Sequence, residues 1–326
     1  MRASAAIFLA WAAFCLSAFN PAGPPGVRPP GERPFYLPYQ YSSFADDTAL
    51  YENAYKSNRR FGEGGTEGWS DGSERPEADA RGEEKGAPTG SGHVVAGTIS
   101  HHLYIRDLIA QYFDRLGHLV HPRTIILMGP NHRARGHSPV ALSAERWRTP
   151  FGFVEPDRRA IGMIAESGLA SIEEEPFVNE HSIGALVPFI RKSFPGARIV
   201  PVIFKKVANR EDCVKLGRVI AGLTDSTLVL ASLDFSHYKM SDEAEKEDSA
   251  SLCVLRSCSP DRVDEAFVDS RPALATLMQV CTLLGAHDVG IVQHTNSGII
   301  SRNPRVSCTS YINALFRSPA GGMKLR

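Results

Sequence analysis

The sequence of 326 residues predicts an α/β fold: a single domain with a central, largely parallel sheet flanked by helices. From His93 onward, short apolar runs rich in β-branched residues alternate with segments of helical periodicity, which is typical of strands and helices around a buried parallel sheet. Hydrophobic residues make up 43% of the chain, enough for a sizeable core. We expect the domain to span residues 93–316, with residues 317–326 as a flexible tail.

Each expected strand is a short apolar run, and each expected helix has the length and period of an amphipathic segment. The strands are Val94–Ile99, Thr124–Met128, Arg198–Phe204, Thr227–Leu233 and Val289–His294, with a late strand at Val306–Leu315. The helices are His102–Leu116, Pro156–Ser167, Ser182–Ser193, Arg210–Leu223, Asp242–Arg256 and Arg271–Leu284.

Residues 1–20 have the form of an export signal. Arg2 precedes an uncharged apolar stretch from Ala5 to Ala18, which ends before Asn20 and Pro21. The stretch is shorter than the roughly 20 residues of a membrane-spanning helix. Three alternatives remain open: this segment is a cleaved signal peptide, an uncleaved anchor, or neither. We expect an exported or membrane-anchored protein, periplasmic or extracellular, if the signal is real, and a cytoplasmic one otherwise.

Residues 21–92 are predicted to be a mostly disordered linker. Seven prolines in residues 20–38 favour an extended tether, and Gly62–Gly92 has too few aliphatic residues to form a core. Between these segments, Phe44–Arg60 is predicted to form a short amphipathic helix. Its apolar side consists of Leu50, Tyr51 and Tyr55.

Composition and motifs argue against several classes of function. The formal net charge of zero argues against a nucleic-acid partner, which needs a basic surface. No glycine-rich dinucleotide or phosphate loop and no GxSxG nucleophile elbow is present. The cysteines form no CxxC pair, so neither a structural zinc site nor a disulfide framework is indicated.

Histidines follow the ends of four expected strands, where open α/β sheets place their ligand sites. A lone histidine in such a place is more often a hydrogen-bonded core or surface residue, but its recurrence favours one shared cavity. The residues are His101 and His102, His132 with its neighbour Asn131, His237, and His294 with the nearby Asn296.

Three carboxylates are candidates to complete such a site. Asp234 precedes His237 by three residues and could fix the tautomer of that base. Asp269 lies on a turn before the last helix, where its alternative role is an N-cap. Glu180 precedes His181 near the start of a helix, where the helix dipole favours its charge and a cap is again the alternative. Two histidines and one carboxylate would leave open positions on Fe(II).

Three motifs in order resemble the Memo family, also called AmmeMemoRadiSam system protein B, which is similar in fold to class III extradiol dioxygenases. The resemblance covers about residues 93–316. The motifs are Gly129-Pro130-Asn131-His132, then Glu180-His181-Ser182-Ile183 followed by Pro188-Phe189, then Ser232-Leu233-Asp234-Phe235-Ser236-His237-Tyr238, and the tail residues Asn296-Ser297 and Thr309-Ser310-Tyr311 agree with them.

The resemblance implies a non-haem metal site. His101 and His132 match the family's metal histidines, with His102 beside the first. The third ligand is a cysteine in many members and a glutamate in the related dioxygenases. This chain has Asp269 in that region and lacks the expected Cys-Gly pattern, so Asp269 is the third expected ligand.

The resemblance assigns further roles in the same site. His237 matches the family's acid/base histidine, and Glu180 and His181 match its pocket lining, with Asp234 as the partner of His237. The expected cofactor is a divalent metal, Fe(II) first, with Cu or Zn as alternatives.

Two hypotheses for function follow. The first is a metal-dependent oxidoreductase of dioxygenase type, or a hydrolytic enzyme with the same site. The second is a non-catalytic module that binds a peptide or a small ligand. In both, the partner is a small molecule or peptide, and only the N-terminal segment could anchor the protein to a membrane. The remaining option is an exported structural protein whose histidines are incidental.

Overall fold

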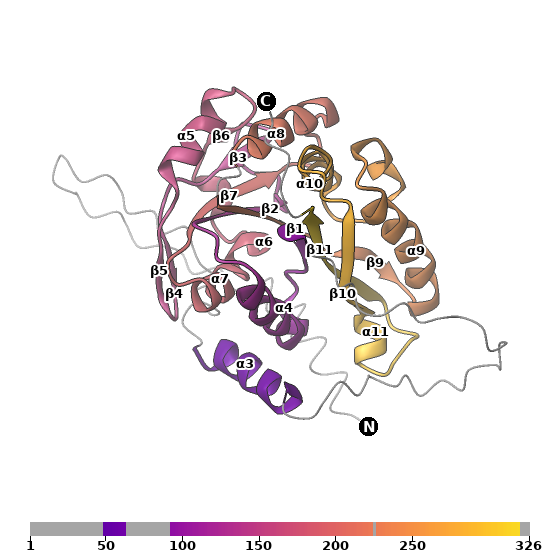
Figure 1. Cartoon of the computed structure of the whole chain (residues 1–326). Helices are drawn as coiled ribbons and strands as arrows, with labels where there is room; N and C mark the ends of the chain where they lie inside the picture. Colours follow the sequence, from indigo (N-terminus) through magenta and orange to yellow (C-terminus); the bar gives the residue numbers. More distant parts are fainter. Residues whose placement is uncertain (1–47, 63–91, 224–225, 320–326) are drawn as a thin grey trace, which may run out of the picture. The chain divides into compact units, whose positions relative to one another are not determined.

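The computed structural model describes residues 48–62, 92–223 and 226–319 (Figure 1). The expected signal segment and most of the expected linker lie outside these residues, while residues 48–62 of that linker are described. Within the part of the chain that is described, no helix is long and apolar enough to cross a membrane.

Nine strands form one mixed sheet in the order β10-β11-β1-β8-β2-β7-β3-β6, and β9 pairs with β11. The four central strands β1, β8, β2 and β7 are parallel, whereas β11 runs antiparallel to β1 and to β10. The strands are β1 (His93–Ile99), β2 (Thr124–Pro130), β3 (Val140–Leu142), β6 (Ser171–Ile172), β7 (Arg198–Phe204), β8 (Thr227–Ser232), β9 (Phe235–Lys239), β10 (Asp288–Asn296) and β11 (Cys308–Ser318), beside a separate hairpin of β4 (Trp147–Thr149) and β5 (Gly152–Val154).

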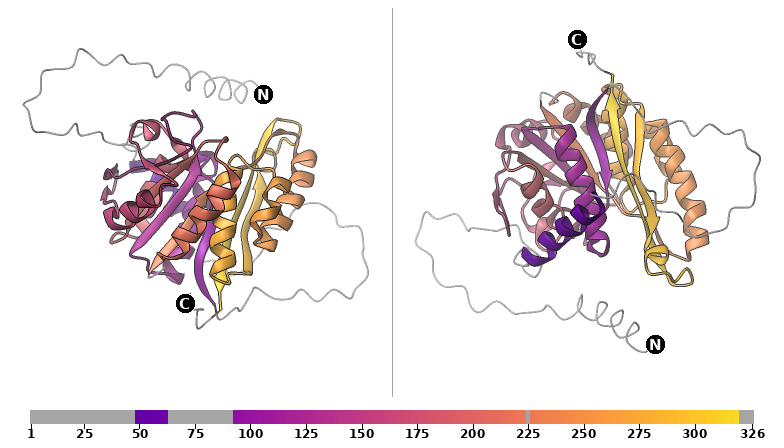
Figure 2. Two further views of the ribbon diagram at one scale, coloured as in Figure 1. Left: turned by 90° about the horizontal axis from the view of Figure 1, so that it is seen from above. Right: turned by 60° about the horizontal axis from the view of Figure 1, so that its bottom comes forward.

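Helices cover both faces of this sheet, as Figure 2 shows from above and from below. Successive residues of β2 alternate between two buried clusters, with Ile126 and Met128 in one and Ile125 and Leu127 in the other. The first cluster includes residues of α5 (Arg158–Glu166), α8 (Arg210–Ala221), α9 (Ser241–Ser257) and α10 (Arg271–Leu283), and the second includes residues of α3 (Thr48–Gly62), α4 (Arg106–Leu119), α6 (His181–Gly184) and α7 (Val187–Ser193).

The predicted α/β fold class is confirmed, and the expected strands and helices are present with small shifts of their ends. One expected helix was wrong: Ser182–Ser193 forms two helices, α6 and α7. Pro188 lies in the first turn of α7, where its missing N–H is tolerated, whereas inside a continuous helix it would break a backbone hydrogen bond. The late strand begins at Cys308 rather than Val306 and continues to Ser318.

Several short elements escaped prediction because two to six residues show no clear period. They are β3, β4, β5, β6 and β9, the four-residue helix α11 (Ser297–Ile300) and the 3-10 helices η1 (Leu103–Ile105), η2 (Glu175–Phe177) and η3 (Pro260–Glu265).

The helix predicted at Phe44–Arg60 is α3, and it packs on the domain. The ring of Tyr51 is fully buried, with its centroid 4.9 Å from that of Phe189 in α7. The hydroxyl groups of Tyr55 and Ser193 are 2.9 Å apart. The expected apolar side of this helix therefore contacts the second buried cluster.

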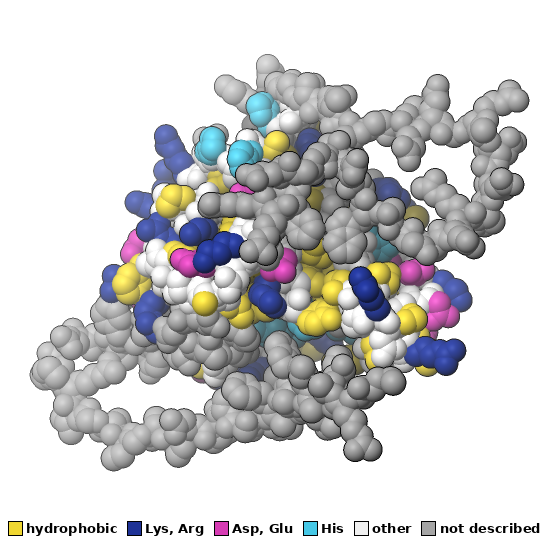
Figure 3. Space-filling view, turned by 90° about the horizontal axis from the view of Figure 1, so that it is seen from below, with side chains coloured by type: hydrophobic (Ala, Val, Ile, Leu, Met, Phe, Trp, Pro, Cys, Tyr) yellow, Lys and Arg dark blue, Asp and Glu magenta, His cyan; other side chains and the backbone are white. Residues whose placement is uncertain are grey.

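The surface mixes both signs of charge. On the face in Figure 3, lysine and arginine side chains lie among acidic and apolar ones, in keeping with a formal net charge of zero.

Candidate metal centre

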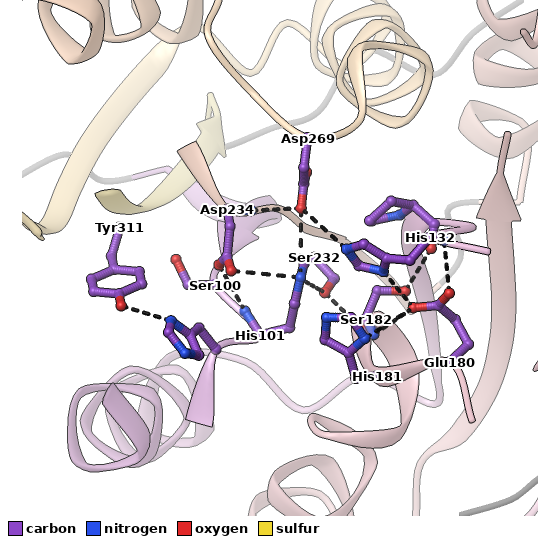
Figure 4. A network of polar contacts seen from close by, with 12 residues as sticks. Ser100, His101, His132, Glu180, His181, Ser182, Ser232, Asp234, Asp269 and Tyr311 are labelled. Carbon is purple, nitrogen blue, oxygen red and sulfur yellow. Dashed lines mark hydrogen bonds and ion pairs between the residues drawn. The ribbon is translucent and has the colours of Figure 1, made fainter. Parts of the chain in front are cut away.

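Three histidines from separate segments meet at the carboxyl ends of the central strands (Figure 4). His101 follows β1, His132 follows β2 and His181 opens α6. The ring centroids of His101 and His132 are 5.2 Å apart, and His181 is 5.0 Å and 4.0 Å from them, respectively. One ligand atom from each of the three lies within 4.8 Å of the others, a spacing that one metal ion could bridge.

The hydrogen bonds of His101 fix its tautomer. The Ser232 hydroxyl donates its one hydrogen to the backbone carbonyl of Ser182 at 2.5 Å. Its oxygen, 3.0 Å from Nδ1 of His101, therefore accepts a hydrogen from that nitrogen. The lone pair of His101 is left on Nε2, the nitrogen that faces the other candidate ligands.

Glu180 positions the second histidine. Its Oε1 is 2.7 Å from Nδ1 of His132, and its Oε2 accepts the backbone N–H of the same residue at 2.8 Å. The carboxylate accepts a hydrogen from Nδ1, so the lone pair of His132 also lies on Nε2. Glu180 is also the N-cap of α6, because its Oε1 accepts the N–H of Ser182 at 2.9 Å. The two roles considered from the sequence therefore occur together.

Two buried carboxylates face these nitrogen atoms. Oδ2 of Asp269 lies 3.5 Å from Nε2 of His101 and 4.0 Å from Nε2 of His132. Oδ2 of Asp234 lies 3.6 Å from Nε2 of His101. The alternative role of Asp269 as a helix cap is filled by Ser270, whose side chain accepts the N–H of Ala273 at 3.3 Å.

Burial shifts these groups toward their neutral forms. Burial, and then the charge of Asp234, raise the pKa of Asp269 well above its usual range, and burial also raises the pKa of Asp234. Burial, followed by the charges of His181 and His132, lowers the pKa of His101 well below its usual range. Burial is the largest cause of the lowered pKa of His181 as well.

Glu180 differs from the other two carboxylates. Burial alone would raise its pKa, but the hydrogen bond with His132 and the charges of His132 and His181 outweigh burial and lower it. Glu180 is therefore an anion that holds the ring of His132 in place.

The arrangement fits a bound cation. Nε2 of His101 and Nε2 of His132 lie 3.5 and 4.0 Å from Oδ2 of Asp269, and a cation bound between them would favour the ionised carboxylate that burial alone disfavours. Oδ1 of Asp269 is also buried without a hydrogen-bond partner among the described residues. Imidazole nitrogen and carboxylate oxygen suit Fe(II), Zn(II) and Cu(II).

His237 and His102 lie beside this cluster. His237 is half-buried on β9, and burial lowers its pKa while the charge of Asp234 opposes the shift. Nδ1 of His102 lies 2.8 Å from the hydroxyl of Tyr311. Figure 4 shows Tyr311 on the far side of Asp234 from His132.

The other expected pocket residues make contacts elsewhere. Nε2 of His294 lies 3.0 Å from Oδ2 of the fully buried Asp248 in α9. Asn296 caps α11 by accepting the N–H of Ile299 at 2.9 Å. Asn131 closes a turn, since its side chain bonds to both the N–H and the carbonyl of Arg135.

The sequence did not predict His181 as a candidate metal ligand, because it was expected only to line the pocket. The position of His181 directly after Glu180 in the chain was the available signal for this role. Because Glu180 contacts His132, the residue after Glu180 also lies at the carboxyl edge of the sheet. The role of Ser232 in orienting His101 was not predictable from the sequence, because no spacing distinguishes this serine from others.

The order of motifs and the metal-type cluster agree with a match to a known family. The family described as Memo-like protein matches residues 91–315. The chain belongs to this family.

Relatives in the Memo family come from archaea and bacteria. The chain is similar to a MEMO1 family protein of Caldivirga maquilingensis, with 31% identity over 46% of this chain and 51% of that protein. It is also similar to a MEMO1 family protein of Methanosarcina acetivorans, with 27% identity over 65% of this chain and 78% of that protein. A MEMO1 family protein of Thermotoga petrophila is 28% identical over 66% of this chain and 79% of that protein. A solved structure of an uncharacterized protein from Escherichia coli K12 has a TM-score of 0.43 at 14% identity over 68% of this chain and 99% of that one.

Proposed function

We propose that this Memo family protein is a metal-dependent enzyme, of dioxygenase-like oxidoreductase or hydrolytic type. The observation that supports it most is the meeting of His101, His132 and His181, whose ligand atoms lie within 4.8 Å of one another beside buried carboxylates. In this proposal the ion is held by Nε2 of His101 and of His132, by His181 and by Asp269.

The bound ion would supply a Lewis acid that binds a substrate oxygen, or a redox centre if it is iron or copper. We keep Fe(II) as the first expectation, although three imidazoles with one carboxylate also suit Zn and Cu. The residues of the chain prepare this site: Glu180 and Ser232 hold the two rings in the ligating tautomer, and burial of Asp269 excludes water from one side of it.

His237 is the candidate acid/base. It is half-buried beside Asp234, with a pKa below its usual range, so at neutral pH the ring is neutral and able to accept a proton. Asp234 also accepts the backbone N–H of His101 at 3.2 Å, which connects the base to the first metal ligand. We propose a small molecule with an oxygen ligand, such as an aromatic diol, as the substrate class.

Metal content tests the proposal. Protein purified without added metal should contain Fe, Cu or Zn near one ion per chain by elemental analysis, and His132→Ala should remove it. His121→Ala, on an exposed loop, is the matched control and should keep the ion. Undiminished metal in His132→Ala would contradict the assignment.

The exposed rim of the site favours a second function, a peptide- or ligand-binding module. Tyr238 follows His237 with a left-handed φ of 60° and a side chain that is 86% exposed, and Met240 beyond it is 55% exposed. Exposed apolar groups of this kind often mark binding surfaces. Oxygen uptake with catechols by the metal-loaded protein would favour the enzyme, whereas a ligand that raises thermal stability without metal or turnover would favour the module.

Partners and location are proposed from the sequence alone. We propose no nucleic-acid partner and membrane attachment, if any, through residues 1–20 only. Fractionation of cells that express the full chain, compared with a chain lacking residues 1–20, tests export.

A further inference from the structure

A second group of charged side chains lies at the other end of the sheet. Arg317 pairs with Val94 at the start of β1, whereas His101 follows the end of that strand. A cavity of about 190 Å³ is lined here by Arg115 of α4, Arg256 of α9, Arg317 of β11 and residues 289–292 of β10.

Arg317 is buried without a sufficient counter-charge. It is 7% exposed, and its Nη1 has no hydrogen-bond acceptor among the described residues. The nearest acid is Asp288, whose Oδ2 is 3.9 Å from Nη1 and whose side chain is 44% exposed. A buried guanidinium with an unfilled donor costs stability unless an acceptor reaches it.

The backbone of β10 makes room for this guanidinium. A Cβ atom at Gly290 would lie 2.9 Å from Nη1 of Arg317, so any larger residue would displace the charged group. β10 is also an end strand of the described sheet, and such a strand has backbone N–H groups that are not paired with a neighbour.

The other two arginines add positive charges that no described acidic side chain neutralises. Arg115 and Arg256 are exposed and form no ion pair or side-chain hydrogen bond with the described residues. The described residues that line the cavity thus include three arginines and no acidic residue, and Asp288 approaches Arg317 only to 3.9 Å, which leaves an excess of positive charge.

We propose that this cavity binds a small oxyanion of the phosphate type, held by Arg115, Arg256 and Arg317. The planar guanidinium presents paired N–H donors that match phosphate oxygens. The volume of about 190 Å³ is below that of pockets for drug-sized ligands, so the ligand is inorganic phosphate or the phosphate group of a small molecule. This site is independent of the proposed metal function.

Calorimetric titration of the full chain with inorganic phosphate tests the inference. Because a bound metal would also attract phosphate, the protein is stripped with a chelator and His132→Ala is titrated in parallel. Both proteins should bind one equivalent, and the affinity should fall with rising salt. Absence of binding, or binding that is lost in His132→Ala, would overturn the proposal.

Two exposed arginines allow variants that leave the core intact. Arg256→Gln and Arg115→Gln should each weaken binding about tenfold or more, because each removes charged hydrogen bonds. Arg218→Gln, at an exposed position of α8, is the matched control and should bind as the parent does. An unchanged affinity in Arg256→Gln would also overturn the proposal. Parallel titration with glycerol 3-phosphate distinguishes free phosphate from a phosphate ester as the ligand.

Discussion

One carboxylate, Glu180, connects three parts of the candidate metal centre. It bonds to the ring and the backbone of His132, and it caps the helix that begins with His181. The same anion therefore sets the direction of one ligand and the starting point of the element that carries another. A residue in this position would support the proposed metal site without being a ligand itself.

Glu180→Gln should weaken metal binding by about 10- to 100-fold, the usual effect of removing a partner that orients a metal histidine. Competition with a chromophoric chelator measures the affinity. Glu166→Gln, at the exposed end of α5, is the control and should leave it unchanged. Full affinity in Glu180→Gln would show that His132 needs no anionic partner.

Residue chemistry made part of this site predictable. His101, His132, Asp234 and Asp269 all follow strand ends or turns, and the structure brings these four together. His294 satisfied the same rule, yet it contacts Asp248 instead. Its strand, β10, is separated from β1 by β11, and the order of strands in a sheet cannot be derived from apolar periodicity.

At the scale of elements, a close approach of α6 to β2 positions the histidines. A Cβ atom at Gly129 would lie 2.8 Å from both Cβ and Oγ of Ser182. The Ser182 hydroxyl uses this proximity to donate a hydrogen bond to the carbonyl of Pro130 at 2.8 Å. The glycine in the Gly129-Pro130-Asn131-His132 motif is thus explained by packing, which the sequence alone did not show.

Gly129→Ala should move α6 away from β2, lower metal occupancy and reduce the free energy of unfolding by roughly 1–3 kcal/mol, as overpacking does. Urea unfolding and elemental analysis measure the two effects. Gly162→Ala in α5 is the control, since no atom lies within 4 Å of the added methyl group. The control should gain up to about 1 kcal/mol from helix propensity. Equal metal content in both variants would contradict this account.

The N-cap of α5 makes the stability of the protein depend on pH. Asp157 accepts hydrogen bonds from the Thr124 hydroxyl at 2.5 Å and from the N–H of Ala160 at 3.0 Å. Burial would raise the pKa of Asp157, but these bonds outweigh it and hold the pKa below its usual range. The stabilisation is therefore present above the pKa of the unfolded state and is lost as the pH falls through the lower pKa of the folded state.

Asp157→Asn should keep the cap of α5 but remove the contribution of Asp157 to the pH dependence of the free energy of unfolding. Between about pH 6 and about pH 3, the free energy of unfolding should fall less in Asp157→Asn than in the parent protein. Urea titrations at both pH values measure the difference. Asp261→Asn, at an exposed position of η3, should follow the parent. A parallel decline in Asp157→Asn would refute the assignment.

At the scale of the whole molecule, the folded domain is larger than the segment that matches the Memo family. The match begins at residue 91, yet α3, far upstream, places Tyr51 in the second buried cluster. The amphipathic pattern predicted this helix, but its docking against Phe189 required the tertiary structure. The α/β class was predictable in the same way, whereas the antiparallel direction of β11 was not.

Tyr51→Ala should destabilise the full chain by about 3–5 kcal/mol, the usual cost of removing a buried aromatic ring. Urea unfolding measures the change. Asn53→Ala, exposed on the same helix, should stay within about 0.5 kcal/mol of the parent. Equal stability of the two variants would mean that α3 does not dock in solution.

The hydrogen bond from Ser232 to the carbonyl of Ser182 has a consequence for how the centre is loaded. The bond joins the end of β8 to the start of α6, so it forms as the chain folds. In the proposed metal site, His101 would present its free nitrogen as soon as the chain folds, and binding of an ion would require no proton to change places on that ring. The ring is in this respect preorganised, and the free-energy cost of orienting it falls on folding rather than on binding.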